Sequence, residues 1–83
     1  MHYFYIVRCA DNTLYCGQTI DLARRVTEHN SKTKKSAKYT RARQPVELVY
    51  SEEYADVGTA LRREVEVKKW PRSKKLKLVM MKQ

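Results

Sequence analysis

Glu64 is the side chain whose setting most needs a chemical explanation. It falls in a helix predicted to begin after Asp56, inside a stripe with three-four spacing that we expect to face the core. The stripe consists of Val57, Ala60, Leu61, Val65 and Lys68. A carboxylate beside a buried face is costly unless a cation pairs with it. The partner of Glu64 is therefore either a basic side chain such as Arg25 or a metal ion.

Two further residues with chemical potential share one face of an earlier predicted helix. Arg25 and His29 are four positions apart, which places their side chains one turn from each other. Arginine is permanently charged and can make two parallel hydrogen bonds to a phosphate. Histidine titrates near neutral pH, so it can serve as an acid or as an orienting donor, although a lone helical histidine is more often an ordinary surface residue.

The elements that must position these groups begin with a predicted β-hairpin. Residues 3–9 read YFYIVRC and residues 14–16 read LYC, and both segments are rich in aromatic and β-branched side chains. The register of the hairpin decides whether Tyr5 and Tyr15 lie on the same face, because side chains alternate along each strand. Taken singly, either tyrosine is more simply explained by packing within the sheet.

Two registers fit the sequence. A two-residue turn at Asp11-Asn12 would put Tyr5 and Tyr15 on opposite faces. A three-residue loop over 10–12, with Asn12 in the left-handed conformation, would pair Tyr5 with Gly17 and bring both tyrosines to one face. We favour the three-residue loop, because asparagine tolerates the left-handed region and this loop type is common.

Together these residues resemble the signature of the GIY-YIG nuclease family. Tyr3-Phe4-Tyr5 is followed by Tyr15-Cys16-Gly17, then by Arg25 and His29, and then by Glu64, in the family's order and spacing. The stretches LYCGQTIDLARRVTEHN and ALRREVEVKKWPRSKKLKLV are similar to small stand-alone bacterial GIY-YIG proteins. The resemblance covers nearly the whole chain.

The resemblance implies a metal-dependent endonuclease that hydrolyses phosphodiester bonds by attack of a water molecule. Tyr5 would act as general base toward that water, and Tyr15 would orient the water or the phosphate. Arg25 would neutralise developing charge, His29 would assist as an acid or orienting donor, and Glu64 would hold one divalent ion, Mg²⁺ or Mn²⁺.

Three departures from the family pattern are visible. Tyr3-Phe4 replaces the Gly-Ile of the first motif, and Cys16 replaces an isoleucine that should only pack. The third departure concerns an asparagine that many members carry after the glutamate helix, since no asparagine follows Glu64. Metal affinity or phosphate positioning is the property that this change would affect.

The charge balance indicates a polyanionic partner. The chain has 18 Lys and Arg against 9 Asp and Glu, a net charge of +9, and nucleic acid, DNA in particular, is the partner we expect. A basic cluster directly follows the Arg25 helix and should bind the phosphate backbone, with one tyrosine as a stacking side chain. Its members are Lys32, Lys34, Lys35, Lys38, Tyr39, Arg41 and Arg43. A second group, at Lys68, Lys69, Arg72, Lys74, Lys75 and Lys77, is at least as well explained by a solvated surface.

The length of 83 residues predicts one α/β (α+β) domain over 1–83 with a small three-stranded antiparallel sheet flanked by helices. The expected order is β-β-α-(α)-β-α-α. Helices are predicted over 21–30, from a cap at Asp56 or Thr59 to Trp70, and over 74–82, with a short one before the strand at 46–54. The first helix should bury Leu22, Ala23 and Val26, and the last Leu76, Val79 and Met80.

Other classes of function fit less well. Cys9 and Cys16 lack the spacing of a zinc site and should be small buried residues. No apolar stretch or secretory signal is visible, so we expect a soluble, cytoplasmic chain without a membrane partner. The alternatives are a non-catalytic nucleic-acid-binding module of the same fold and a protein that docks an acidic partner. A homodimer or a targeting partner protein would be compatible with so small a nuclease.

Overall fold

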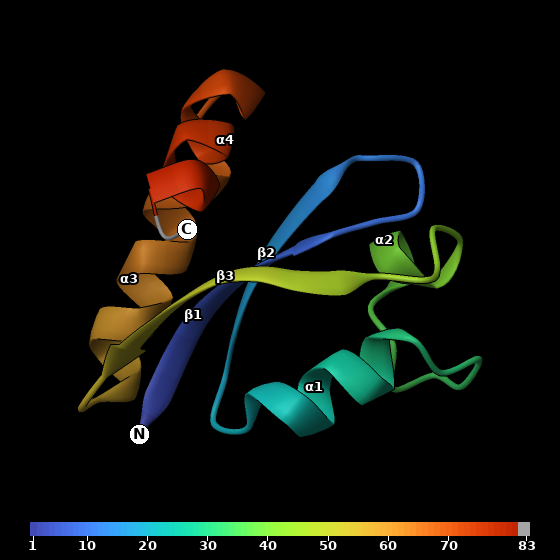
Figure 1. The fold of residues 1–83 in the computed structure, drawn as a ribbon. Helices are drawn as coiled ribbons and strands as arrows, with labels where there is room; N and C mark the ends of the chain where they lie inside the picture. The colour runs from blue at the N-terminus through green and yellow to red at the C-terminus, as the bar shows by residue number, and fades with distance from the viewer. Residues whose placement is uncertain (82–83) are drawn as a thin grey trace.

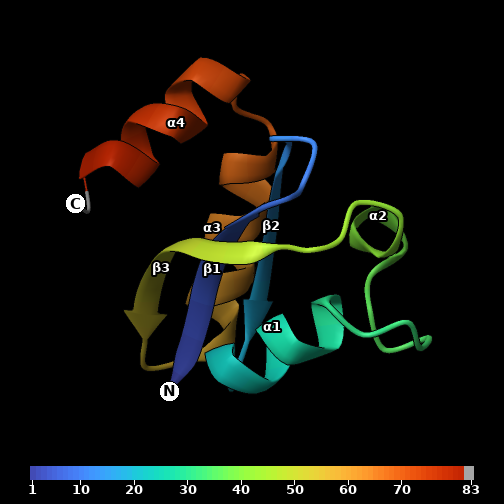
Figure 2. The same cartoon turned by 45° about the vertical axis from the view of Figure 1, so that its right-hand side comes forward.

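The computed structural model describes residues 1–81 and has three strands and four helices in the expected order. The elements are β1 (His2–Arg8), β2 (Leu14–Thr19), α1 (Leu22–His29), α2 (Lys38–Arg41), β3 (Glu47–Tyr54), α3 (Val57–Lys68) and α4 (Arg72–Met81). The strands form an antiparallel sheet in the order β2-β1-β3. Helices α1 and α2 lie on one side of the sheet and α3 and α4 on the other (Figure 1; Figure 2). The predicted fold class is confirmed.

The hairpin adopts the three-residue loop. Tyr5 pairs with Gly17 and Val7 with Tyr15 in the β1–β2 register. The Cys9 amide donates to the Thr13 carbonyl at 2.8 Å, and Asn12 has a φ of 67°. The left-handed conformation of Asn12 therefore brings Tyr5 and Tyr15 to the same face of the sheet.

Helix α1 begins where the sequence predicted, and α3 begins after Asp56, one of the two predicted caps. The Asp21 carboxylate accepts from the Arg24 amide at 3.1 Å at the start of α1, and the Asp56 carboxylate accepts from the Thr59 amide at 2.8 Å at the start of α3. These caps satisfy amides that have no partner within the helix. Every helix within residues 1–81 is too short or too polar to span a bilayer.

Alternation along β1 divides the core into two layers. On one face, Phe4 and Ile6 pack with Cys16, Val67 and Val79, which come from β2, α3 and α4. On the other face, Tyr5, Val7 and Cys9 pack with Val46, and with Tyr15 and the α1 residues Leu22 and Val26 at the margin. Both cysteines are buried free thiols, as expected.

The predicted apolar stripe of α3 is wrong. Val57, Leu61 and Val65 are 44%, 42% and 56% exposed, whereas Ala60 and Val67 are fully buried. The stripe 57-61-65 and the stripe 60-64-67 both follow helical periodicity, so spacing does not choose between them. The face that packs on the sheet is the one with Ala60 and Val67, and Glu64 lies on that face.

Two smaller predictions about inward-facing residues also fail. Met80 is 69% exposed, whereas Val79 is buried as predicted and Leu78 packs beside it. Ala23 in α1 is exposed. A short helix that contacts the sheet along only part of its length buries fewer side chains than its apolar periodicity predicts. The predicted end of the last helix at Lys82 lies outside the described residues.

A polar cluster joins α3 to β3. Arg63 donates to both carboxylate oxygens of Glu52, at 2.9 and 3.0 Å, and the hydroxyls of Tyr50 and Tyr54 donate to the same carboxylate. The guanidinium also lies 5.1 Å from the centroid of the Trp70 ring. Burial acts to raise the pKa of Glu52, but the hydrogen bonds from Arg63 and the two tyrosines outweigh it and hold that pKa below its usual value.

Replacing Arg63 with leucine should lower the free energy of unfolding by about 3 kcal/mol at pH 7, because it leaves a half-buried carboxylate without its cation. Arg62→Leu is the matched control, since Arg62 is the adjacent arginine on α3 and its side chain is exposed. Glu52 has a depressed pKa in the folded state, so its contribution is present above the unfolded value of 4.5 and is lost as pH falls through the folded value. Urea unfolding should therefore show the Arg63→Leu deficit at pH 7 and a smaller one near pH 3. An equal deficit at both pH values would contradict this account.

Candidate active site

A chain of buried hydrogen bonds links β1 to α1 and α2. The Tyr5 hydroxyl and His29 Nε2 are 2.7 Å apart, and His29 Nδ1 lies 2.8 Å from the Thr40 hydroxyl. The Thr40 hydroxyl donates to the Ala37 carbonyl at 3.1 Å, so toward His29 it is an acceptor. This order places the imidazole proton on Nδ1 and leaves Nε2 to accept from Tyr5.

The protonation states of this chain follow from burial. Tyr5 is 2% exposed and His29 is fully buried. Burial raises the pKa of Tyr5 to about 12, although the Arg25 guanidinium works in the opposite direction. Burial, aided by the charge of Arg25, lowers the pKa of His29 to about 4. At neutral pH His29 is therefore an uncharged proton acceptor facing a neutral phenol.

Gly17 makes room for the Tyr5 ring. A Cβ atom at position 17 would lie 2.4 Å from the Tyr5 hydroxyl oxygen and 2.6 Å from Cζ. No side chain can occupy that position while Tyr5 keeps its hydrogen bond to His29. The glycine that ends Tyr15-Cys16-Gly17 is thus required by the close approach of Tyr5 from the neighbouring strand.

Tyr15 connects this chain to α2 and α3. Its ring meets His29 edge-on, with centroids 5.3 Å apart, and stacks on Tyr39 at 5.7 Å with an interplanar angle of 24°. Lys68 Nζ lies 5.6 Å from the centroid of the same ring. Because β2 is an edge strand, Lys68 reaches this face although α3 packs on the other side of the sheet.

Arg25 is held in place at one nitrogen. Its Nη1 donates to the Glu28 carboxylate at 3.0 Å and to the Lys35 carbonyl at 2.7 Å. Burial acts to lower the pKa of Arg25, but the contacts with Glu28 and Tyr5 raise it overall, so the group is cationic at any working pH. These two contacts account for the donors of Nη1, and a guanidinium carries three further N–H groups.

Glu64 pairs with Lys68, not with Arg25. The carboxylate lies 2.8 Å from Lys68 Nζ one turn later on α3, and this contact raises the pKa of Lys68. Within residues 1–81 it is the one ion pair of Glu64, whose side chain is only 18% exposed. Glu64 is also near enough to Tyr5 that its charge raises the pKa of the phenol.

The sequence-predicted catalytic set is thus brought together around β2. Tyr5, Tyr15 and His29 are in direct contact, while Arg25 and Glu64 act electrostatically on Tyr5 from opposite sides of the sheet edge. The sequence did not assign a supporting role to four residues, of which Gly17 and Lys68 were noted for other reasons and Glu28 and Thr40 were missed. The i,i+3 spacing of Glu28 from Arg25 and the i,i+4 spacing of Lys68 from Glu64 were available as signals, whereas nothing local pointed to Thr40.

The predicted basic cluster divides into two kinds of side chain. Arg41 donates to the hydroxyl and carbonyl of Ser36, and Arg43 donates to the Tyr39 carbonyl and pairs with Asp11 at 3.2 Å. These guanidinium groups tie the loop before α2 and the hairpin tip together. The exposed lysines are Lys32, Lys34, Lys35 and Lys38. Phosphate binding by the cluster stays a prediction, and the lysines are its better candidates.

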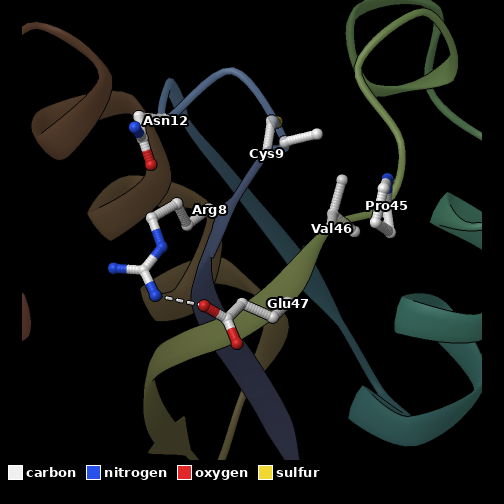
Figure 3. Close-up of a pocket in the computed structure, with 7 residues that line it drawn as sticks. Arg8, Cys9, Asn12, Pro45, Val46 and Glu47 are labelled. Atoms are coloured by element: carbon white, nitrogen blue, oxygen red, sulfur yellow. Dashed lines mark hydrogen bonds and ion pairs between the residues drawn. The ribbon is translucent and has the colours of Figure 1, made fainter.

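A hollow of about 300 Å³ lies away from these residues, between the end of β1 and the start of β3. Figure 3 shows Cys9 and Val46 on its wall and the ion pair between Arg8 and Glu47 across its rim. None of the predicted catalytic residues lines it. This hollow is therefore not part of the candidate active site.

Comparison with known proteins bears directly on this arrangement. Residues 1–77 match the GIY-YIG catalytic domain. The chain belongs to the GIY-YIG family. It is 53% identical over 74 residues to a UPF0213 protein of Bacillus pumilus, covering 89% of this chain and 74% of that one. A UPF0213 protein of Natronomonas pharaonis is 49% identical over 78 residues, covering 94% and 89%.

A solved structure supports the same conclusion. The solution NMR structure of a UPF0213 protein from Bacillus halodurans is 44% identical and superposes with a TM-score of 0.62, over 98% of this chain and 84% of that one. The expected resemblance to small stand-alone GIY-YIG proteins is confirmed. A GIY-YIG domain implies nuclease-type chemistry on nucleic acid, and nucleases of this family generally use divalent metal ions.

The donor set is compatible with such an ion. Within residues 1–81 no cluster of three His, Cys, Asp or Glu side chains could enclose a metal. Glu64 is a half-buried carboxylate whose partner is a flexible lysine ammonium, which can move aside for another cation. One carboxylate with waters and substrate phosphate oxygens is the arrangement that Mg²⁺ commonly accepts. The residues present therefore fit an open site that is completed by substrate.

Proposed function

We propose that this GIY-YIG protein is a metal-dependent endonuclease that hydrolyses phosphodiester bonds in DNA with little sequence preference. The observation that carries the proposal is the convergence of Tyr5, His29 and Tyr15 with Arg25 and Glu64 at the β2 edge. A neutral proton acceptor can activate the attacking water, a fixed cation can stabilise the phosphate charge, and a half-buried carboxylate can hold a metal ion, which together suit hydrolysis of a phosphodiester.

Tyr5 and His29 act together as the base. A free phenolate is unfavourable at this position, because burial raises the pKa of Tyr5 to about 12. The Tyr5 hydroxyl instead takes a proton from the attacking water as its own proton passes to His29 Nε2, 2.7 Å away. The imidazolium that forms is short-lived, because burial and the charge of Arg25 hold the His29 pKa at about 4, and its Nδ1 proton stays hydrogen-bonded to the Thr40 hydroxyl. His29 is thus a proton acceptor in this step and not the donor that the sequence suggested as one option.

Arg25 and Tyr15 act on the phosphate. The Arg25 guanidinium, held by Glu28, neutralises the charge that develops on the non-bridging oxygens. Tyr15 lies between His29 and Tyr39 and can donate its hydroxyl to the phosphate or to the attacking water. Its role is to orient, since the base function already belongs to Tyr5.

Glu64 would hold the divalent ion, for which Mg²⁺ or Mn²⁺ is the choice that suits a single carboxylate. Lys68 would release the carboxylate and remain nearby, beside the Tyr15 ring. When bound, the ion supplies a Lewis acid that stabilises the charge of the leaving oxygen. Within residues 1–81 Glu64 would be the principal protein ligand, and weak, substrate-assisted metal binding is the expected consequence of a single carboxylate.

The test is cleavage of labelled single-stranded, duplex and branched DNA with Mg²⁺ or Mn²⁺ at low salt. Arg25→Ala should reduce the rate by about 10²–10³-fold, because it removes one preorganised charge from the transition state. Arg24→Ala is the matched control, since Arg24 is the exposed neighbour on the same helix and loses the same charge.

Equal rates for the two arginine variants would show that Arg25 does not act on the transition state. Salt-sensitive binding without metal-dependent cutting of any of the three substrates would replace the nuclease proposal with a non-catalytic binding module. An RNA counterpart of each substrate decides whether DNA is the preferred nucleic acid.

A further inference from the structure

A second hollow, of about 200 Å³, lies at the end of the β1–β2 hairpin, between α2 and the first turn of α4. It is lined by Thr13 and Leu14 at the start of β2, by Tyr39 of α2, and by Arg72 and Lys75 in the first turn of α4. In Figures 1 and 2 the end of the β1–β2 hairpin lies between α2 and the N-terminal end of α4. The hollow therefore joins two basic segments that are far apart in the sequence.

This hollow begins where the candidate active site ends. Tyr39 lines the hollow and also stacks on Tyr15, whose ring contacts His29. A polymer bound at Tyr5 and Arg25 that continues past Tyr15 must pass Tyr39. The next protein groups it would meet are Arg72 and Lys75.

The charges of the hollow are uncompensated. None of its five lining residues is acidic, and neither the Arg72 nor the Lys75 side chain has a hydrogen bond or ion pair with any residue in 1–81. Lys75 is half-buried, so an unpaired ammonium there favours an anion nearby. Arg41 and Arg43, by contrast, are engaged within the fold.

The volume of the hollow favours binding of the nucleic-acid backbone rather than of a base. About 200 Å³ accommodates a phosphate with part of its sugar, but not a base pair. The Tyr39 ring already contacts Tyr15 and the Arg43 guanidinium, which lies 4.0 Å from its centroid. Part of the ring stays open, since Tyr39 is 38% exposed, and the stacking role that the sequence suggested stays a prediction.

We propose that Arg72 and Lys75 form a phosphate subsite that holds the nucleic-acid backbone beside the scissile phosphate. The substrate runs from Tyr5 and Arg25 across Tyr15 and Tyr39 to the first turn of α4. This inference rests on the proposed nuclease function, because it assigns the path of that enzyme's substrate. It also separates Arg72 and Lys75 from Lys69 and Lys77, which are exposed and do not line the hollow.

The experiment measures DNA binding without cleavage, in the Glu64→Gln background. Binding of a labelled duplex and a labelled single strand is followed by fluorescence anisotropy over a range of salt concentrations. Arg72→Ala with Lys75→Ala is compared with Lys69→Ala plus Lys77→Ala, which removes the same charge from exposed positions outside the hollow. Lys75→Arg keeps the charge and serves as the rescue variant.

We expect the subsite pair to weaken duplex binding about tenfold at low salt and to reduce the slope of log Kd against log salt by about two, one for each lost phosphate contact. The control pair should change the slope by less than half as much. Lys75→Arg should retain the natural slope. Equal effects from the two double variants would overturn the subsite, because general electrostatic attraction would then explain both.

Failure of the subsite and failure of the proposed function give different results. In the cleavage assay, with Glu64 restored, the subsite pair should raise KM about tenfold and leave kcat within about threefold. If DNA binding depends on Arg72 and Lys75 but the protein cleaves no substrate, the phosphate subsite is supported and the nuclease proposal is rejected. Cleavage in which the two double variants have the same KM would keep the nuclease and reject the subsite.

Discussion

Glu64→Gln should reduce metal-dependent cleavage by about 10⁴-fold, because loss of a bound divalent ion removes several kcal/mol of transition-state stabilisation. Glutamine keeps the size and hydrogen-bonding capacity of the side chain but removes its charge. The fold should survive, since Glu64 makes one ion pair within residues 1–81, to Lys68 on its own helix. Pairs of this kind contribute only about 0.3–0.5 kcal/mol.

The same substitution distinguishes a metal ligand from a salt-bridge partner. If Glu64 serves only to pair with Lys68, Glu64→Gln will cleave DNA at the natural rate and lose a little stability. A metal ligand instead predicts that binding of Mn²⁺, measured by electron paramagnetic resonance in the presence of DNA, is lost together with cleavage. Glu66→Gln is the control, because Glu66 is an exposed carboxylate on the same helix that pairs with Arg63.

Tyr5→Phe should lower the cleavage rate by about 10³-fold, the middle of the range for loss of a general base. The variant keeps the ring that packs between β1 and α1 and removes the hydroxyl that donates to His29. It leaves Nε2 of a buried histidine without a donor, so we expect a loss of about 1–3 kcal/mol in the free energy of unfolding. Assays therefore belong well below the melting temperature. Tyr3→Phe on the same strand is the matched control.

Gly17→Ala tests the position of the Tyr5 hydroxyl without removing it. The new methyl group would lie 2.4 Å from that oxygen, so the ring must turn away from His29. Cleavage should fall nearly as far as in Tyr5→Phe, while DNA binding is retained. If Tyr5 and His29 were only a structural pair, both variants would lose stability and keep the natural kcat. That result would remove the Tyr5-to-His29 proton transfer from the mechanism.

The sequence by itself determined the arrangement of the strands and pointed to the residues of the candidate site, whose catalytic roles stay a prediction. Strand alternation and the tolerance of Asn12 for the left-handed region placed Tyr5 and Tyr15 on one face, as the register confirms. Asp21 and Asp56 fixed where two helices begin. Signals of this kind are local, because a turn or a cap is decided by a few neighbouring residues.

Only the tertiary structure decided which surfaces meet. The stripes at 57-61-65 and 60-64-67 are equally periodic, and the sheet surface that α3 covers selects the second. Thr40 reaches His29 only because α2 folds back beside the hairpin, and the same packing places Tyr39 in one hollow with Arg72 of α4. Such contacts join residues that are distant in the chain, and no local pattern specifies them, because their free energy comes from packing between elements rather than from any one element.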